Sequence, residues 1–155
     1  MAPPLRVAAR VVALAPDDRV LLVYYAENGG FWATPGGRIE DGDDNDRAGA
    51  RRELAEEVGI DPVLVDLREQ VAERSEEHEV GDQLVRQVER YFLAYLDPDD
   101  INPARATQPD TIRATRWWTV QELRDTTETV YPPGLADLVT NIQTTGVPSH
   151  PVVLR

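Results

Sequence analysis

Three glutamates stand within five consecutive positions near the middle of the chain: Glu53, Glu56 and Glu57. In a helix, spacings of three and four residues place such side chains next to one another, where like charges repel by roughly a few tenths of a kcal/mol per pair. The arrangement becomes favourable when cations lie between the carboxylates. Magnesium is the natural candidate, because it takes oxygen ligands, usually one or two carboxylates with waters and phosphate oxygens.

The surrounding sequence predicts the helix that would carry these glutamates. Residues that favour a helix N-cap precede it, and the helix is expected to begin near Asp46 and to end at Gly59. An apolar stripe on the neighbouring face can dock on a sheet, and it consists of Ala50, Leu54 and Val58. Upstream, Pro35-Gly36-Gly37 predicts a turn whose glycines permit a close approach by a ligand. A solvated helix face is the alternative for three glutamates considered alone.

The order of the whole stretch argues against that alternative, because it resembles the Nudix box, the signature of the Nudix hydrolase superfamily. That signature reads Gly, five residues, Glu, seven residues, Arg-Glu, an aliphatic, any residue, Glu-Glu, any residue, Gly, an aliphatic. Gly37 begins it here, and Arg52-Glu53-Leu54-Ala55-Glu56-Glu57-Val58-Gly59-Ile60 reproduces the second half. The resemblance covers this motif most sharply, and the order of the flanking strands fits the family fold.

The first half of the box departs from the signature twice. Asp43 stands where the family has its first glutamate, and eight residues separate it from Arg52. We expect the extra residue to lie in the loop or first helical turn, with the helix register beyond it unaffected. In the family the first acid braces the loop against the arginine, so the shorter Asp43 bears on that bracing contact more than on the chemistry.

The resemblance implies a metal-dependent pyrophosphohydrolase with Mg²⁺ or Mn²⁺ as cofactor. Its substrate would be a nucleoside diphosphate derivative or a nucleoside triphosphate, cleaved by attack of water on phosphorus. The implied metal ligands are Glu53, Glu56, Glu57 and the backbone carbonyl of Gly37. Arg52 would orient the carboxylates, and an ordinary surface ion pair is the alternative for it.

The general base stays open at this stage. Some family members use a glutamate of the box, so Glu53 is one candidate, and others use an acid on a distant loop. Residues 73–83 are very polar and are expected to form a mobile surface loop or hairpin tip. Further candidates for the base lie in this segment: Glu73, Glu76, Glu77, Glu79 and His78, since histidine is a common general base.

Substrate selection must come from residues outside the box. We expect Arg38 to pair with a phosphate and Trp32 and Tyr24 to stack on a base, although aromatics in strands more often belong to a core. Other candidates for stacking are Tyr25, Phe31, Trp117, Trp118 and Tyr131. Gly49 lies one turn before Glu53, where glycine costs roughly 1 kcal/mol relative to alanine. The hypothesis is that it leaves room for a metal-bound phosphate, and the alternative is that it admits a neighbouring loop.

The elements around the box predict an α+β fold, an α/β/α sandwich with a mixed sheet between helices, formed by a single domain over residues 1–155. Strands are expected at 5–14, 19–25, 62–72, 85–96 and 111–118, and further helices at 119–125 and 133–144. Residues 97–110 read as irregular.

The composition of the chain limits the classes of partner that it is expected to bind. The chain has 28 acidic and 16 basic side chains and a net charge of −12, which disfavours binding to a nucleic acid polymer. It lacks cysteine, which excludes disulfides and thiolate catalysis, and its interrupted N-terminal apolar stretch does not read as a membrane segment. A cytoplasmic protein with a nucleotide-type small-molecule substrate is expected. Because relatives in the family are often dimers, the sequence leaves both a monomer and a homodimer as alternatives.

Two rival functions belong to the same fold. The first is a non-catalytic nucleotide-binding sensor that has lost box residues, whereas this chain keeps all three glutamates. The second is an isomerase of isopentenyl diphosphate, a Nudix relative that uses a cysteine, which this chain lacks.

Overall fold

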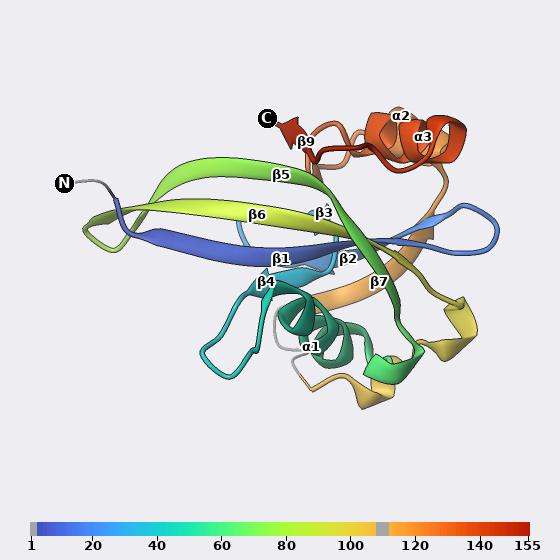
Figure 1. Ribbon diagram of the computed structural model, residues 1–155, viewed down its shortest axis with the longest axis horizontal. Helices are drawn as coiled ribbons and strands as arrows, with labels where there is room; N and C mark the ends of the chain where they lie inside the picture. Colours follow the sequence, from blue (N-terminus) through green and yellow to red (C-terminus); the bar gives the residue numbers. More distant parts are fainter. Residues whose placement is uncertain (1–2, 108–111) are drawn as a thin grey trace.

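The computed structural model describes residues 3–107 and 112–155, which form a mixed sheet flanked by helices (Figure 1). The strands are β1 (Leu5–Leu14), β2 (Val20–Tyr25), β3 (Phe31–Ala33), β4 (Gly36–Arg38), β5 (Asp66–Val80), β6 (Gln83–Tyr95), β7 (Ile112–Trp118), β8 (Val130–Tyr131) and β9 (Val152–Leu154). The helices are α1 (Asp46–Val58), α2 (Val120–Asp125) and α3 (Leu135–Thr145). Single 3₁₀ turns cover Pro62–Leu64, Pro98–Asp100 and Pro103–Arg105.

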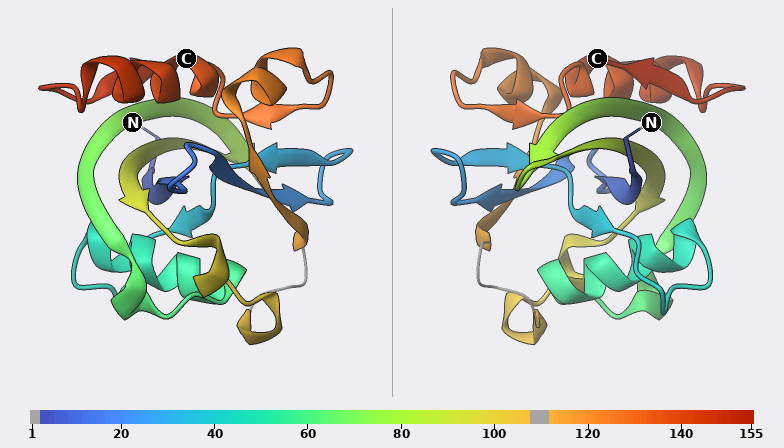
Figure 2. Two further views of the ribbon diagram at one scale, coloured as in Figure 1. Left: turned by 90° about the vertical axis from the view of Figure 1, so that its right-hand side faces the viewer. Right: turned by 90° about the vertical axis from the view of Figure 1, so that its left-hand side faces the viewer.

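The strands run in the order β8-β3-β2-β1-β6-β5-β9, with β4 paired to β1 and β7 paired to β2. Parallel pairing joins β1 to β6, β3 to β8 and β5 to β9, and the other pairs are antiparallel. The sheet is strongly curled, with α1 below it and α2 and α3 above it in both side views (Figure 2). The predicted α+β sandwich is therefore confirmed.

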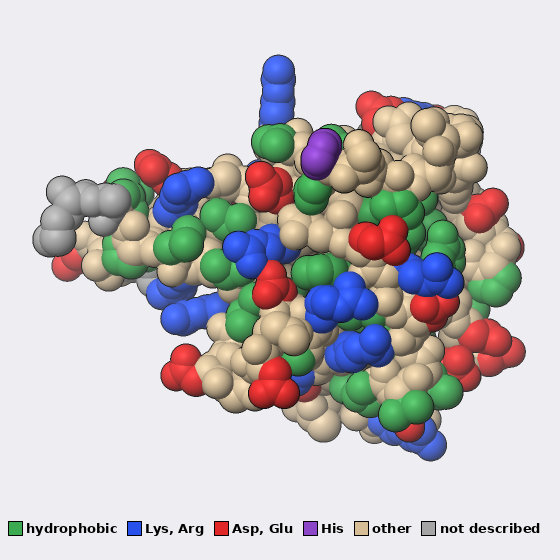
Figure 3. All heavy atoms as spheres, in the orientation of Figure 1, with side chains coloured by type: hydrophobic (Ala, Val, Ile, Leu, Met, Phe, Trp, Pro, Cys, Tyr) green, Lys and Arg blue, Asp and Glu red, His purple; other side chains and the backbone are tan. Residues whose placement is uncertain are grey.

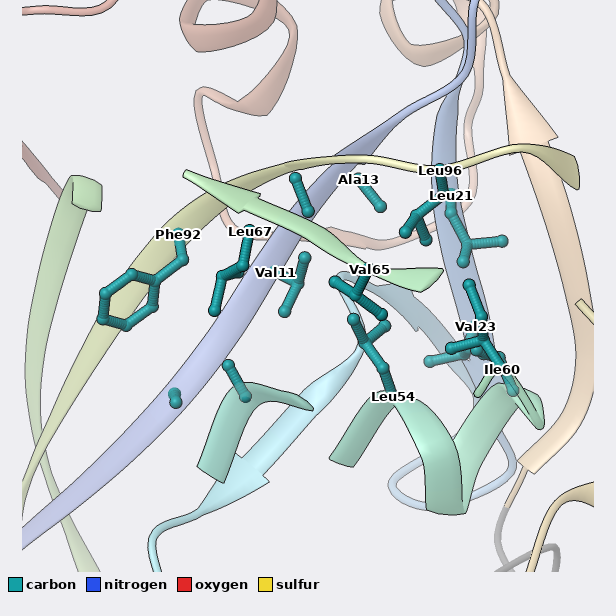
Figure 4. Packing of buried hydrophobic residues seen from close by; sticks show 14 of the residues in the cluster. Val11, Ala13, Leu21, Val23, Leu54, Ile60, Val65, Leu67, Phe92 and Leu96 are labelled. Atoms are coloured by element: carbon teal, nitrogen blue, oxygen red, sulfur yellow. The ribbon is translucent and has the colours of Figure 1, made fainter. Parts of the chain in front are cut away.

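Strand β1 shows why helices cover both faces of the sheet. Its side chains alternate between the two faces of the sheet. Ala9, Val11 and Ala13 belong to the core between the sheet and α1, whereas Val12 and Leu14 belong to the core between the sheet and α3. Figure 4 shows Leu54 of α1 and the following Ile60 meeting Val11, Val23 and Val65 in the first of these cores.

Helix α1 forms as the sequence predicts. It begins at Asp46 after the N-cap Asn45, whose side chain accepts a hydrogen bond from the Ala48 amide at 2.8 Å. It ends at Gly59, which adopts the left-handed conformation with φ 71°. The predicted apolar stripe of Ala50, Leu54 and Val58 is fully buried, and this packing fixes which way the glutamates on the adjoining face point.

Residues 73–83, predicted to form a loop or a hairpin tip, form the end of the β5–β6 hairpin with a turn at Gly81-Asp82, so a loop over the whole segment is wrong. Residues 66–80 form one strand, β5, which pairs antiparallel with β6 from Asp66↔Tyr95 to Val80↔Gln83 in a long hairpin (Figure 1). The segment lacks the usual apolar alternation of a strand, because much of it faces solvent or a polar cavity. The strand expected at 62–72 accordingly begins only at Asp66, after a 3₁₀ turn.

The remaining elements agree closely with the predicted ones. Strands at 5–14 and 20–25 and the helix at 120–125 are present, and α3 begins at Leu135, two residues after Pro133. The strand predicted from residue 111 is described from Ile112, and residues 108–110 of the irregular segment lie outside the described residues. No helix in the described ranges is long and apolar enough to cross a membrane.

Candidate functional site

A cavity of about 780 Å³ opens where β1 to β6, β8 and α1 meet. Its walls carry both signs of charge: the carboxylates of Glu27, Glu53, Glu57, Glu76 and Glu89, and the guanidinium groups of Arg10 and Arg74. A volume of this size is in the range of small-molecule sites. The outer surface shows a similar mixture of arginines and acidic side chains over the face in Figure 3.

Glu57 is buried, with 7% of its surface exposed, the same fraction as for Glu53. Its Oε1 accepts a hydrogen bond from the Gly36 amide at 2.7 Å, and its Oε2 accepts one from the Tyr25 hydroxyl at 2.5 Å. Burial raises the pKa of Glu57 to about 7, although these two hydrogen bonds and the nearby Arg10 oppose the shift. Two hydrogen bonds thus hold the carboxylate in a buried environment that disfavours its ionised form.

Glu53 lies one turn before Glu57 and lines the same cavity. Its carboxylate packs directly on Gly37, where an added Cβ would stand 2.6 Å from Oε1. A glycine is therefore required at position 37 for this carboxylate to lie there. Burial raises the pKa of Glu53, and the adjacent Arg52 counteracts part of that effect.

Arg52 joins the loop to the helix. Its Nε donates to Asp43 Oδ1 at 2.8 Å and its Nη2 to Oδ2 at 3.0 Å, which is a bidentate pair. The pKa of Asp43 is lowered by these hydrogen bonds. The shorter acid and the extra residue therefore still allow the bracing contact, because the loop brings Asp43 within reach.

Glu56 does not share the cavity with the other two glutamates. Its carboxylate accepts a hydrogen bond from Arg52 Nη1 at 2.9 Å, and it borders a separate, shallower depression beside Arg105. The structure thus brings two of the three predicted glutamates together and places the third against the arginine.

Gly49 has a packing role. An added Cβ would meet Asp43 Oδ2 at 3.0 Å and Ile39 Cγ1 at 3.5 Å, and the residue does not line the cavity. The structure supports the alternative that this glycine admits the loop and gives no support to the hypothesis of room for a phosphate.

The alternation of β5 sorts the candidates for the general base. Arg74, Glu76 and His78 point into the cavity, whereas Glu73, Glu77 and Glu79 occupy the intervening positions and do not line it. Glu76 Oε2 accepts a hydrogen bond from Arg74 Nη1 at 3.1 Å. Glu53, Glu76 and His78 are the predicted bases that reach the cavity.

A buried ion cluster that the sequence reading missed forms another wall. Glu89, which is 8% exposed, accepts hydrogen bonds from Arg10 Nε at 2.9 Å, Arg74 Nη1 at 3.3 Å and the Tyr91 hydroxyl at 3.2 Å. Arg10 also donates to the Gly36 carbonyl at 2.9 Å. The available signal was an arginine inside the apolar run of β1, but only the register between β1 and β6 reveals its partner.

Aromatic side chains complete the walls. The ring of Tyr25 lies 5.4 Å from that of Phe31, which lies 5.5 Å from that of Tyr131 in an edge-to-face arrangement. The Arg74 guanidinium stands over Tyr131 at 5.6 Å. Contacts therefore run in a closed circuit around the cavity: Glu57, Tyr25, Phe31, Tyr131, Arg74, Glu89, Arg10, Gly36 and back to Glu57.

Three residues predicted to bind substrate, Trp32, Tyr24 and Arg38, lie outside the cavity, whereas the further candidates Tyr25, Phe31 and Tyr131 line it. Trp32 is buried in the core between the sheet and α3, where its ring lies 5.2 Å from the ring of Tyr24 and 5.3 Å from that of Trp118. Neither Tyr24 nor Trp32 lines the cavity, and Arg38 is exposed, with its carbonyl accepting a hydrogen bond from Arg52. Adjacent residues of a strand point to opposite faces, which is why Phe31 and Tyr25 face the cavity and their neighbours do not.

The donor set suits a hard cation. Within residues 3–107 and 112–155, no group of three or more carboxylate or imidazole side chains is arranged to hold a metal ion. Glu53 and Glu57 nevertheless line one cavity beside the Gly36–Gly37 backbone. Two carboxylates are the number that magnesium commonly takes from a protein, with waters and phosphate oxygens as its other ligands.

The chain was compared with known proteins and structures. The NUDIX domain family model matches residues 4–138. A curated protein of Myxococcus xanthus named octanoyltransferase is 39% identical over 102 residues, and this match spans 63% of the chain and 27% of that protein.

Two solved structures share the fold. An Ap4A hydrolase of C. elegans in a binary complex matches with a TM-score of 0.65 and 18% identity, over 89% of this chain and 95% of the other. The NUDIX domain of Shewanella oneidensis NrtR, complexed with ADP ribose, matches with a TM-score of 0.65 and 20% identity, over 93% and 90%.

Proposed function

The chain belongs to the NUDIX domain family, and from that premise we propose that it is a metal-dependent pyrophosphohydrolase. It would cleave the diphosphate linkage of a nucleoside diphosphate derivative or a nucleoside triphosphate by attack of water on phosphorus. The observation that carries this proposal is the convergence of Glu53 and Glu57 beside the Gly36–Gly37 backbone, in a cavity that also contains two arginines. One domain acting in the cytoplasm on a nucleotide-type small molecule is the setting we propose.

The proposed cofactor is Mg²⁺ or Mn²⁺. Glu53, Glu57 and the Gly37 carbonyl would hold it, and Glu56 would join them only by releasing Arg52, with which it is paired. A bound cation would supply charge neutralisation at the phosphate oxygens. Arg52 keeps the role of orienting residue, since it connects Asp43 with both Glu53 and Glu56.

Side chains of the cavity would supply the general base and the contacts to the substrate. Glu53, Glu76 or His78 would accept the proton of the attacking water, because these are the predicted bases that line the cavity. Arg74 would approach a phosphate once it releases Glu76. Phe31 and Tyr131 would take the stacking role first given to Trp32 and Tyr24, since they are the aromatics on the cavity wall beside Arg74.

The comparisons support a nucleotide-type substrate. One neighbour is an Ap4A hydrolase and another NUDIX domain binds ADP ribose. The octanoyltransferase match covers 27% of that protein, so we do not extend acyl transfer to this chain. A non-catalytic nucleotide-binding sensor is the alternative function, and the experiment below separates it from the enzyme.

The test is release of phosphate and nucleotide, followed by chromatography with mass detection, from a panel of nucleoside diphosphate derivatives and nucleoside triphosphates with magnesium. Wild type is compared with Glu57→Gln and with Glu77→Gln, a matched control on β5 outside the cavity. We expect turnover of at least one compound, abolished by EDTA and by Glu57→Gln and retained by Glu77→Gln. Absence of turnover, with a panel compound still raising the melting temperature, would favour the sensor.

A further inference from the structure

We propose that Tyr25 is a positioning residue that holds the Glu57 carboxylate in the orientation in which it binds the cation. This inference rests on the proposed function, because it requires Glu57 to be a metal ligand. Glu57 has one donor on each oxygen: the Gly36 amide of β4 holds Oε1 at 2.7 Å, and the Tyr25 hydroxyl of β2 holds Oε2 at 2.5 Å. Two donors from different strands fix the plane of the carboxylate.

The donors of Glu57 differ in kind from those of its neighbours. Glu53, Glu56 and Asp43 accept from the guanidinium of Arg52, and Glu89 accepts from two guanidinium groups. Each of those contacts offsets part of the negative charge of the carboxylate. A phenol and an amide carry no net charge, so they orient Glu57 and leave its negative charge for a cation. Each carboxylate oxygen can accept a second interaction, so the existing hydrogen bonds do not exclude a metal.

Tyr25 is itself fixed firmly enough to act in this way. It is 8% exposed, it packs on Phe31 at 5.4 Å, and it stands opposite Phe31 in the pairing of β2 with β3. The pairing of β2 with β7 shifts register between Tyr24 and Tyr25. The extra residue of this irregularity lies in β7, and the pairing of β2 with β3 stays regular through Tyr25, so ordinary strand alternation directs the hydroxyl toward the carboxylate. Its position on a strand outside the box explains why the motif does not reveal it.

Tyr25→Phe is the direct test, because it removes one hydroxyl and keeps the ring. The matched control is Tyr91→Phe, since Tyr91 is also a buried cavity tyrosine that donates to a glutamate, Glu89, at 3.2 Å. The primary measurement is the dissociation constant for Mg²⁺, obtained by calorimetric titration without substrate, and urea unfolding reports stability separately.

We expect Tyr25→Phe to weaken Mg²⁺ binding by about tenfold, in the range found when the partner of a metal ligand is removed. Its turnover should fall at limiting magnesium and recover at saturating magnesium, whereas Tyr91→Phe should bind Mg²⁺ as wild type does. The proposal is overturned if Tyr25→Phe binds Mg²⁺ with wild-type affinity, or if both variants lose affinity equally.

Glu57→Gln separates this proposal from the proposed function. If Glu57→Gln leaves Mg²⁺ affinity unchanged, Glu57 is not a ligand and the assignment of the metal site fails. If Glu57→Gln abolishes binding while Tyr25→Phe does not alter it, only the positioning role of Tyr25 is wrong.

Discussion

Replacing Glu57 with glutamine should stabilise the metal-free protein at alkaline pH. The carboxylate is 7% exposed, and burial raises its pKa from 4.5 to about 7. Because the folded state has the higher pKa, it binds the proton more tightly than the unfolded chain does. The resulting stabilisation is fully present below the unfolded pKa and is lost as pH rises through the folded pKa.

The size of this stabilisation follows from the difference between the pKa of Glu57 in the unfolded and folded states. A rise in the pKa of Glu57 from 4.5 to about 7 corresponds to about 3 kcal/mol of stability, most of which is lost between about pH 5 and pH 8. Glutamine mimics the protonated acid. Its oxygen can accept from the Gly36 amide and its NH₂ can donate to the Tyr25 oxygen, so both present contacts have a counterpart.

The assay is urea unfolding with EDTA at several pH values between these limits. Wild type and Glu57→Gln should have similar free energies of unfolding at the acidic end, and the variant should be the more stable protein at the alkaline end. The comparison of the two proteins cancels the titration of groups that do not interact with Glu57. Parallel pH profiles would refute the reasoning. Added Mg²⁺ at alkaline pH should stabilise wild type and not the variant, which reverses the order.

Three further predictions concern the loop, the brace and the aromatic wall. Gly37→Ala should displace the Glu53 carboxylate, because its Cβ would stand 2.6 Å from Oε1; turnover should fall at least about tenfold with an unchanged circular dichroism spectrum. Asp43→Ala should lower the free energy of unfolding in urea by about 1–3 kcal/mol, because it leaves the box arginine without its bidentate partner. Tyr131→Leu should raise KM for nucleotides several-fold, whereas Tyr95→Leu should not. An arginine guanidinium stands over each ring, and the two tyrosines are similarly exposed, at 39% and 41%, but only Tyr131 lines the cavity.

The parts of the structure that depend on local sequence were predictable. Helix α1 has an N-cap, an apolar stripe and a terminal glycine within fifteen residues, and each of these signals acts on its immediate neighbours. The box follows the same logic, because its spacing is read along one helix. Glu53 and Glu57 accordingly lie together on the cavity.

The rest of the site depends on pairing between distant strands. The contact of Arg10 with Glu89 requires the parallel register of β1 with β6, which no local signal specifies. Tyr24 and Trp32 were chosen instead of Tyr25 and Phe31 because alternation shows that neighbours point to opposite faces without showing which face has the cavity. The sequence of the polar part of β5 indicates a loop or hairpin tip instead of a long strand, because its inward side chains line a polar cavity and not an apolar core.

The closed circuit of contacts around the cavity limits how independently its properties can be tuned. Phe31 touches Tyr131 on one side and Tyr25 on the other, and Tyr25 holds Glu57. An enlarged or reshaped side chain at position 31, introduced to admit a different base, would therefore also disturb the carboxylate proposed to bind metal. Residues that share partners in this way have non-additive effects. Redesign of substrate preference is better begun at Asn28 or Thr129, which line the cavity without belonging to the circuit.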